Sequence, residues 1–124
     1  MTIIEAINKI DTQKSNTFSQ EDKVDWLNRL DRIIKTQIID THEGAADVTF
    51  TGYDDNTDLH TVLLAPAPYD EVYLRWLEAQ IDYANGEIGK YNVAITMYNT
   101  AFEAFEAYYN RTHMPLQKGN RFIF

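Results

Sequence analysis

Residues 70–110 read DEVYLRWLEAQIDYANGEIGKYNVAITMYNTAFEAFEAYYN, and this stretch decides the predicted fold. Mostly apolar residues recur along it at helical spacing, and ten steps cover 36 residues, or 3.6 residues per step. The stripe consists of Tyr73, Leu77, Gln80, Ala84, Ile88, Tyr91, Ile95, Tyr98, Phe102, Phe105 and Tyr109. Because the phase continues across Gly86 and Gly89, we expect one long helix over about residues 70–110, with a bend at the glycines.

The same stretch carries a second apolar flank, which bears on whether the chain acts alone. This flank consists of Val72, Trp76, Tyr83, Val93, Met97, Ala101, Ala104 and Tyr108. A helix of this length would be about 60 Å long, whereas a compact domain of this size has a radius of gyration of roughly 14 Å. The helix would project beyond the domain or fold back at the glycines. We favour the interpretation that the apolar remainder forms a partner surface; the alternative is a bundle in which the glycines make a turn and bury both flanks.

Two shorter helices are predicted at the start of the chain. Thr2 and Glu5 have the spacing of a capping box, and isoleucines follow on one face, which predicts a first helix ending near Asp11. Ser19 provides a second N-terminal signal. The apolar spacing after it predicts an amphipathic helix over Gln20–Ile39.

A change of pattern follows between residues 47 and 64. Two short segments with β-type alternation, DVTFTG and LHTVLLA, flank the polar stretch YDDNTD. This pattern predicts a small β-hairpin insert. Its tip would be formed by the polar residues Asp54, Asp55, Asn56 and Asp58.

The oxygen-rich tip resembles the start of an EF-hand calcium loop, but the later positions do not fit. An EF-hand that began at Asp54 would need glycine at its sixth position and glutamate at its twelfth. Those positions hold Leu59 and Ala65. Asp and Asn are favoured in turns because their side chains bond to the local backbone. We therefore expect a turn here rather than a metal site.

The composition limits the other functions. The chain has 124 residues, no cysteine and a net charge of −8. Residues 111–124 carry +3 and no acid, which leaves −11 for residues 1–110 and disfavours a nucleic-acid surface. No apolar run approaches the roughly 18 residues needed to span a bilayer, so no membrane contact is expected. We expect one helical domain with the hairpin insert over residues 1–110 and an extended arm over residues 111–124, which ends in Phe122, Ile123 and Phe124 and docks on its own body or on a neighbour.

No pattern in the chain predicts catalysis. A metal-dependent enzyme that uses Asp40, His42 and Glu43 remains an alternative, but the three histidines are separated by 18 and 53 residues, unlike the short spacing of zinc ligands. No cysteine is present, and neither serine lies in a Gly-x-Ser-x-Gly turn. We expect a protein that is not an enzyme and has no catalytic residue, no metal and no cofactor.

Three pieces of the sequence resemble a known class of proteins: LLAPAPYDEVY, AQIDYANGEIGKYN and YNRTHMP. Together they make residues 38–115 similar to the small head–tail connector (adaptor or neck) proteins of long-tailed bacteriophages and Gram-positive prophages. The resemblance implies a mainly helical subunit of the virion that assembles in the host cytoplasm. It would form a homo-oligomeric ring, twelve-fold in this family, that joins the portal protein to the next neck or tail protein. DNA would pass through the ring without specific binding. The predicted hairpin departs from this pattern.

The predicted partner interface combines the aromatic helix face with the arm. It consists of Tyr73, Trp76, Tyr83, Tyr98, Phe102, Phe105, Tyr109, Arg111, Arg121, Phe122, Ile123 and Phe124. The alternative to a connector is a small binding or regulatory protein, not an enzyme, that covers a partner with the same aromatic face.

Overall fold

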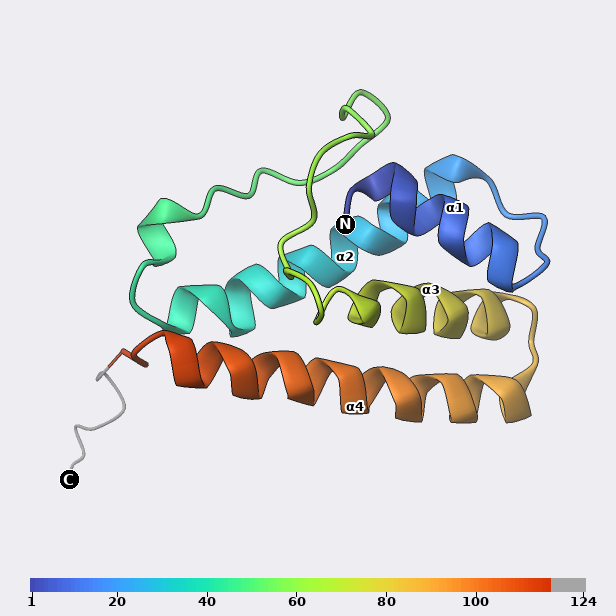
Figure 1. Ribbon diagram of the computed structural model, residues 1–124. Coiled ribbons are helices and arrows are strands. Elements are labelled where there is room, and N and C mark those ends of the chain that lie inside the picture. The colour runs from blue at the N-terminus through green and yellow to red at the C-terminus, as the bar shows by residue number, and fades with distance from the viewer. Residues whose placement is uncertain (117–124) are drawn as a thin grey trace.

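The computed structural model describes residues 1–116 and is mainly helical, as the sequence predicts (Figure 1). Its elements are α1 (Ile3–Gln13), α2 (Gln20–Gln37), η1 (Ile39–Thr41), η2 (Ala45–Asp47), α3 (Glu71–Ala84) and α4 (Ile88–Thr112). The two η elements are single 3₁₀ turns in the connection between α2 and α3.

The first two helices begin at the predicted caps. The Thr2 side chain accepts a hydrogen bond from the Glu5 amide, and the Glu5 carboxylate accepts one from the Thr2 amide, which completes the capping box. The Ser19 hydroxyl accepts a hydrogen bond from the Asp22 amide at the start of α2. Each helix then buries one apolar stripe. The stripes are Ile3, Ala6, Ile7 and Ile10 in α1, and Val24, Leu27, Leu30 and Ile34 in α2.

The prediction of one long helix over residues 70–110 is wrong, because the chain reverses at Gly86. This glycine has φ +72°, a left-handed conformation that other L-residues adopt only at a cost. The Gly86 amide donates to Tyr83 O and the Glu87 amide donates to Asp82 O, both at 3.0 Å. These two bonds form a Schellman motif, which ends α3. α4 then runs back alongside α3 (Figure 1).

The apolar stripe keeps its helical spacing across residues 73–109 although these residues form two helices and not one. Each helix carries its own 3.6-residue stripe because each packs one face on the same core. A three-residue connection can leave the two stripes in phase while the chain direction reverses. The pattern therefore identified the buried residues far from the turn, such as Tyr73 and Phe105, but not the turn itself, beside which Ala84 and Ile88 are exposed.

The predicted β-hairpin over residues 47–64 is also wrong. Within residues 1–116 the only β-type pairs are isolated bridges, one between Thr2 and Val62 and one between His42 and Pro115. The β-prone segment 59–63 pairs with the start of the chain instead of with residues 47–52. The Ile3 amide donates to Thr61 O at 3.0 Å, and the Leu63 amide donates to Met1 O at 2.9 Å. The N-terminal segment thus takes the hydrogen bonds that a hairpin strand would have used.

α3 is the central helix of the bundle. It packs against α1 and α2 on one side and against α4 on the other, and among the described helices α4 lies beside α3 alone (Figure 1). Tyr73, Leu77 and Ile81 of α3 are fully buried between these neighbours. No helix within the described residues is both long and apolar enough to cross a membrane.

The segment after α4 begins later than the predicted arm. Arg111 and Thr112 still belong to α4, and residues 113–116 then lie against η1 and the two residues that follow it. The Glu43 amide donates to Met114 O at 2.8 Å, and the Leu116 amide donates to Thr41 O at 2.9 Å. The rest of the predicted arm lies outside the described residues.

The two glycines of the α3–α4 connection give a matched test of this turn. Gly86→Ala places a side chain at positive φ and should lower the free energy of unfolding by about 1 kcal/mol. Gly89→Ala lies within α4, where an added Cβ meets no atom, and should raise it by roughly 0.5–1 kcal/mol. Urea unfolding followed by circular dichroism measures both, and stabilisation by both variants would indicate a continuous helix instead.

Candidate functional site

α4 buries little of its surface in the bundle. Of its 25 residues, Ala94, Tyr98, Phe105 and Tyr109 are buried. α4 also carries apolar residues outside this buried stripe. Among them, Val93 has 62% and Met97 has 40% of its surface exposed. Isolated exposed apolar residues are ordinary, whereas a continuous apolar flank indicates a binding surface.

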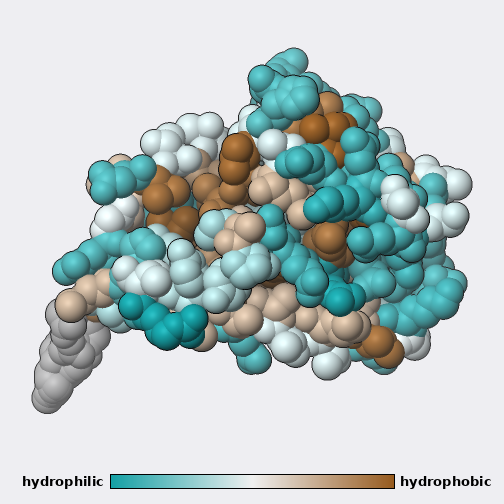
Figure 2. Space-filling model, in the orientation of Figure 1, coloured by the Kyte–Doolittle hydropathy of each residue, from teal (hydrophilic) through white to brown (hydrophobic). Residues whose placement is uncertain are grey.

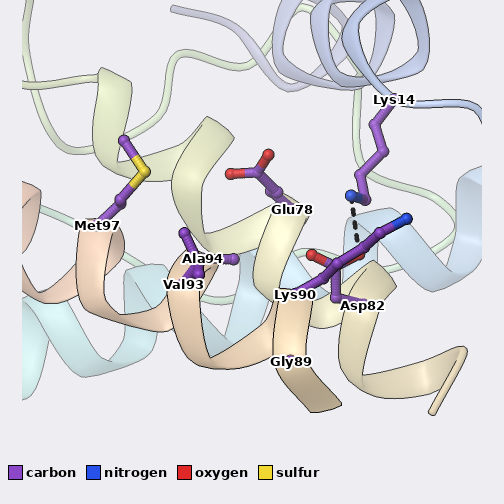
Figure 3. A pocket seen from close by; sticks show the side chains of 8 residues that line it. All are labelled: Lys14, Glu78, Asp82, Gly89, Lys90, Val93, Ala94 and Met97. Carbon is purple, nitrogen blue, oxygen red and sulfur yellow. Dashed lines mark ion pairs between the residues drawn. The ribbon is translucent and has the colours of Figure 1, made fainter. Parts of the chain in front are cut away.

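This flank lines a groove between α3 and α4. One part of the groove, about 450 Å³, lies between Glu71 and Arg75 of α3 and the α4 residues Thr96, Met97, Thr100, Ala101 and Ala104. Met97 also belongs to a second hollow of about 300 Å³, nearer the α3–α4 connection (Figure 3). We call the two together the α3–α4 groove. On the face in Figure 2, brown apolar areas interrupt the teal surface, one of them near the end of the α3–α4 pair that carries the connection.

Charged residues stand along the groove, and they are paired with one another. Lys14 Nζ reaches from the end of α1 to within 2.8 Å of the buried Asp82 Oδ1 (Figure 3). This ion pair lacks the directional geometry of a hydrogen bond, and Asp82 Oδ1 has no hydrogen-bond partner within the described residues. Arg75 lies 3.5 Å from Glu71 and 3.7 Å from Glu78, and its Nη1 donates to Met97 Sδ at 3.8 Å. The groove is therefore an apolar floor bordered by paired charges.

A second cluster of polar groups is buried in the core around Asp31 of α2. Its Oδ2 accepts hydrogen bonds from the Tyr53 hydroxyl at 2.5 Å and from the Leu64 amide at 3.2 Å. Its Oδ1 accepts one from the Tyr73 hydroxyl at 2.6 Å. The Tyr73 oxygen in turn accepts from the Ala65 amide at 2.7 Å. Asp31 therefore joins α2, the connection before α3, and α3 itself.

Burial is the largest influence on the pKa values of the Asp31, Tyr53 and Tyr73 side chains. It raises the pKa of Asp31 above its ordinary value of 3.8, against the opposing effect of the three hydrogen bonds. Burial, together with the neighbouring Asp31 carboxylate, raises the pKa of Tyr53 and of Tyr73. The tyrosines therefore remain protonated donors. Tyr53 and Leu64 also line a hollow of about 230 Å³, but the Asp31 carboxylate itself is fully buried, and the cluster serves as a structural link.

His42 fixes the other end of α4. Its Nδ1 lies 2.6 Å from Ile38 O, its Nε2 lies 2.6 Å from Asn110 Oδ1, and its ring meets Tyr109 edge-on. His42 is buried, whereas Asp40 and Glu43, the other members of the metal-site alternative, are exposed. Within residues 1–116 no three His, Cys, Asp or Glu side chains gather as a metal site would need.

The acidic loop uses its oxygens on its own backbone. Asp54 Oδ1 accepts a hydrogen bond from the Asn56 amide at 2.8 Å, and Asp58 Oδ1 accepts one from the His60 amide at 2.9 Å. Such bonds stabilise tight turns. The side chains of Asp54, Asp55, Asn56 and Asp58 are exposed.

The residues of the predicted interface fall into three groups. Tyr73, Tyr98, Phe105 and Tyr109 are buried within the chain, and burial raises the pKa of Tyr98 to about 12. Trp76 and Phe102 are half-buried, and Tyr83 and Arg111 are exposed. The last group, Arg121, Phe122, Ile123 and Phe124, lies outside the described residues.

The sequence pattern predicted the apolar residues of the α3–α4 groove but not the polar cluster around Asp31. The groove residues Val93, Met97, Ala101 and Ala104 all belong to the second apolar flank, but the aromatic stripe took precedence in the predicted interface. The Asp31 cluster was missed. An acid directly after Leu30, on the buried face of α2, was the signal that could have revealed it.

Comparisons of the chain with protein-family models, with curated proteins and with solved structures find no match. The resemblance to connector proteins therefore stays a prediction.

The hydrogen bonds of the Asp31 cluster predict a ranking of two conservative variants. Tyr73→Phe removes a donor to Asp31 and the acceptor of the Ala65 amide, and should lower the free energy of unfolding by about 2–4 kcal/mol. Tyr53→Phe removes one donor and should cost about 1–2 kcal/mol. Tyr83→Phe, at an exposed site, is the control and should have little effect. Urea unfolding of the three variants measures the ranking, and the reverse order would contradict it.

The raised pKa of Asp31 predicts a pH dependence with a definite sign. The folded chain holds the Asp31 proton more tightly than the unfolded chain, so the contribution of Asp31 to stability falls as pH rises from 3.8 through the folded-state pKa. Asp31→Asn does not titrate. The unfolding free energy of the wild type minus that of Asp31→Asn should therefore fall over this window and then level off. Urea unfolding at a series of pH values tests this, because the other carboxyls cancel in the difference; a difference that rises with pH would contradict it.

Proposed function

We propose that this chain is a structural subunit of a phage neck, a head–tail connector that forms a homo-oligomeric ring between the portal protein and the next neck or tail protein. The observation that carries the proposal is the apolar flank of α4, which a single copy of residues 1–116 leaves exposed. A subunit of a ring needs such a surface, because its neighbours bury it. The sequence resemblance over residues 38–115 names the kind of assembly.

The charge of the chain agrees with a channel through which DNA moves. Residues 1–110 carry −11, so a ring built from many copies would present a strongly acidic surface. Like charge repels phosphate groups and keeps DNA from adhering to the wall. The ring would thus guide DNA without binding it.

A second candidate function follows from the shape of the groove. A hollow that runs between two antiparallel helices and has an apolar floor can accept an amphipathic helix of a partner protein. The chain would then be a small binding or regulatory protein without catalysis. Because Tyr98, Phe105 and Tyr109 are buried within the chain, the partner would bind Val93 and Met97 rather than the aromatic stripe.

Assembly on the portal protein encoded in the same genome tests the connector function. We expect the purified chain to co-sediment with portal rings as a complete ring of subunits. Met97→Lys places a charge on the apolar flank and should weaken assembly about tenfold or more, because burying a methionine is worth roughly 1.5–3 kcal/mol.

Asn99→Lys is the matched control, because it adds the same charge to α4 at an exposed position outside the groove. It should assemble like the wild type. A wild-type chain that fails to bind portal rings would refute the connector function. Tight binding of one copy to an unrelated partner protein would favour the second candidate.

A further inference from the structure

The α3–α4 groove has chemical features that restrict what can occupy it. Its floor is apolar, with Val93, Met97 and Ala104 exposed to solvent. Its edge holds the carboxylates of Glu71 and Glu78, whose ion pairs with Arg75 are long and partly exposed. Such pairs contribute little and exchange readily. The groove is lined by as many cations as carboxylates, so the preference for charge comes from residues 1–116 as a whole, which carry −10. A fitting occupant is therefore a short apolar segment that also carries a cation and no acid.

The chain itself contains a segment of this kind. Residues 117–124 read QKGNRFIF, with Lys118 and Arg121 as cations, no acidic side chain, and three consecutive large apolar residues, Phe122, Ile123 and Phe124. Residues 1–116 hold every Asp and Glu of the chain and the entire groove. The two parts are therefore complementary in charge and in hydrophobicity.

We propose that residues 121–124 of one copy dock in the α3–α4 groove of a second copy. The apolar side chains lie over Val93 and Met97, and Arg121 pairs with the carboxylates at the groove edge. This inference rests on the proposed function for the presence of a neighbouring copy, and it deepens that function by naming the contact between subunits.

The path of the chain favours docking on a second copy over docking on its own groove. Leu116 is held beside Thr41 by a backbone hydrogen bond, beyond the end of α4. Met97 lies 15 residues back along the helix from Thr112, or about 22 Å. Phe122 follows Leu116 by six residues, which span at most about 22 Å when fully extended. Because Leu116 lies beyond Thr112, the chain would have to be fully extended to bring residues 121–124 over Met97 of the same copy, whereas docking on a second copy needs no such extension.

Cross-linking between two differently labelled copies tests the contact directly. The native chain has no cysteine, so single thiols can be placed at will. One chain carries Thr100→Cys, at an exposed position in the groove, and the other carries Asn120→Cys, next to the docking residues but outside them. A short bismaleimide should join the two chains. The matched control replaces Thr100→Cys with Asn99→Cys, an exposed neighbour on the polar side of α4.

We expect the T100C and N120C chains to form a cross-linked dimer at least about tenfold faster than the N99C and N120C chains, because docking raises the effective concentration of the two thiols. Adding Met97→Lys to the T100C chain should reduce the rate to that of the control. Deleting residues 121–124 from the N120C chain should do the same, while its circular dichroism spectrum and unfolding midpoint stay unchanged.

Two results would overturn the proposal. One is an equal cross-linking rate for T100C and N99C, measured both in free solution and on assembled portal rings. The other is an intrachain product from the T100C/N120C double variant with no product between single variants. Rings that assemble on the portal without this cross-link would leave the proposed function intact and refute the contact alone. Cross-linked pairs that never bind the portal would refute the proposed function and retain the contact.

Discussion

The Asp31 carboxylate holds three separate parts of the chain in one place. Its two oxygens accept hydrogen bonds from Tyr53, from the Leu64 amide and from Tyr73, and no cation within residues 1–116 is among its partners. A buried carboxylate is tolerated only when its hydrogen-bonding capacity is filled. The positions of these three donors are therefore constrained together, and with them the path of the long irregular connection between α2 and α3.

The hydrogen bonds of Asp31 also position α3, and the arrangement of the other helices depends on α3. Tyr73 ties the first turn of α3 to α2, and the buried Leu77 and Ile81 continue the contact along the helix. α3 thus becomes the support on which α4 lies. Because α3 is the only helix beside α4 within residues 1–116, one apolar flank of α4 stays open in this part of the chain, and the groove results from this lack of a second neighbour.

Local signals in the sequence were sufficient for the parts of the fold that depend on local chemistry. The caps at Thr2 and Ser19 and the stripes after them predict α1 and α2, since each rule involves residues within one or two turns. The reversal at Gly86 was missed because helical periodicity gives no information about chain direction. The hairpin was mispredicted because residues 59–63 pair with the start of the chain. Pairing between segments so far apart in sequence depends on tertiary packing, which a local pattern does not contain. The Asp31 cluster depends on Tyr53 and Tyr73, which lie 22 and 42 residues away, so no local pattern contains it.

The two halves of α4 are held unequally. The later half is fixed by buried Phe105 and Tyr109, by the His42 ring and by the stacking of Tyr69 on Tyr108. The earlier half places only Ala94 and Tyr98 in the core, yet it carries Val93 and Met97. Backbone hydrogen bonds with few buried neighbours open at lower free energy than those of the core. A molecule that occupies the groove therefore reduces the local fluctuations of this half of α4. The conformational entropy that the helix loses opposes binding and lowers the net binding free energy.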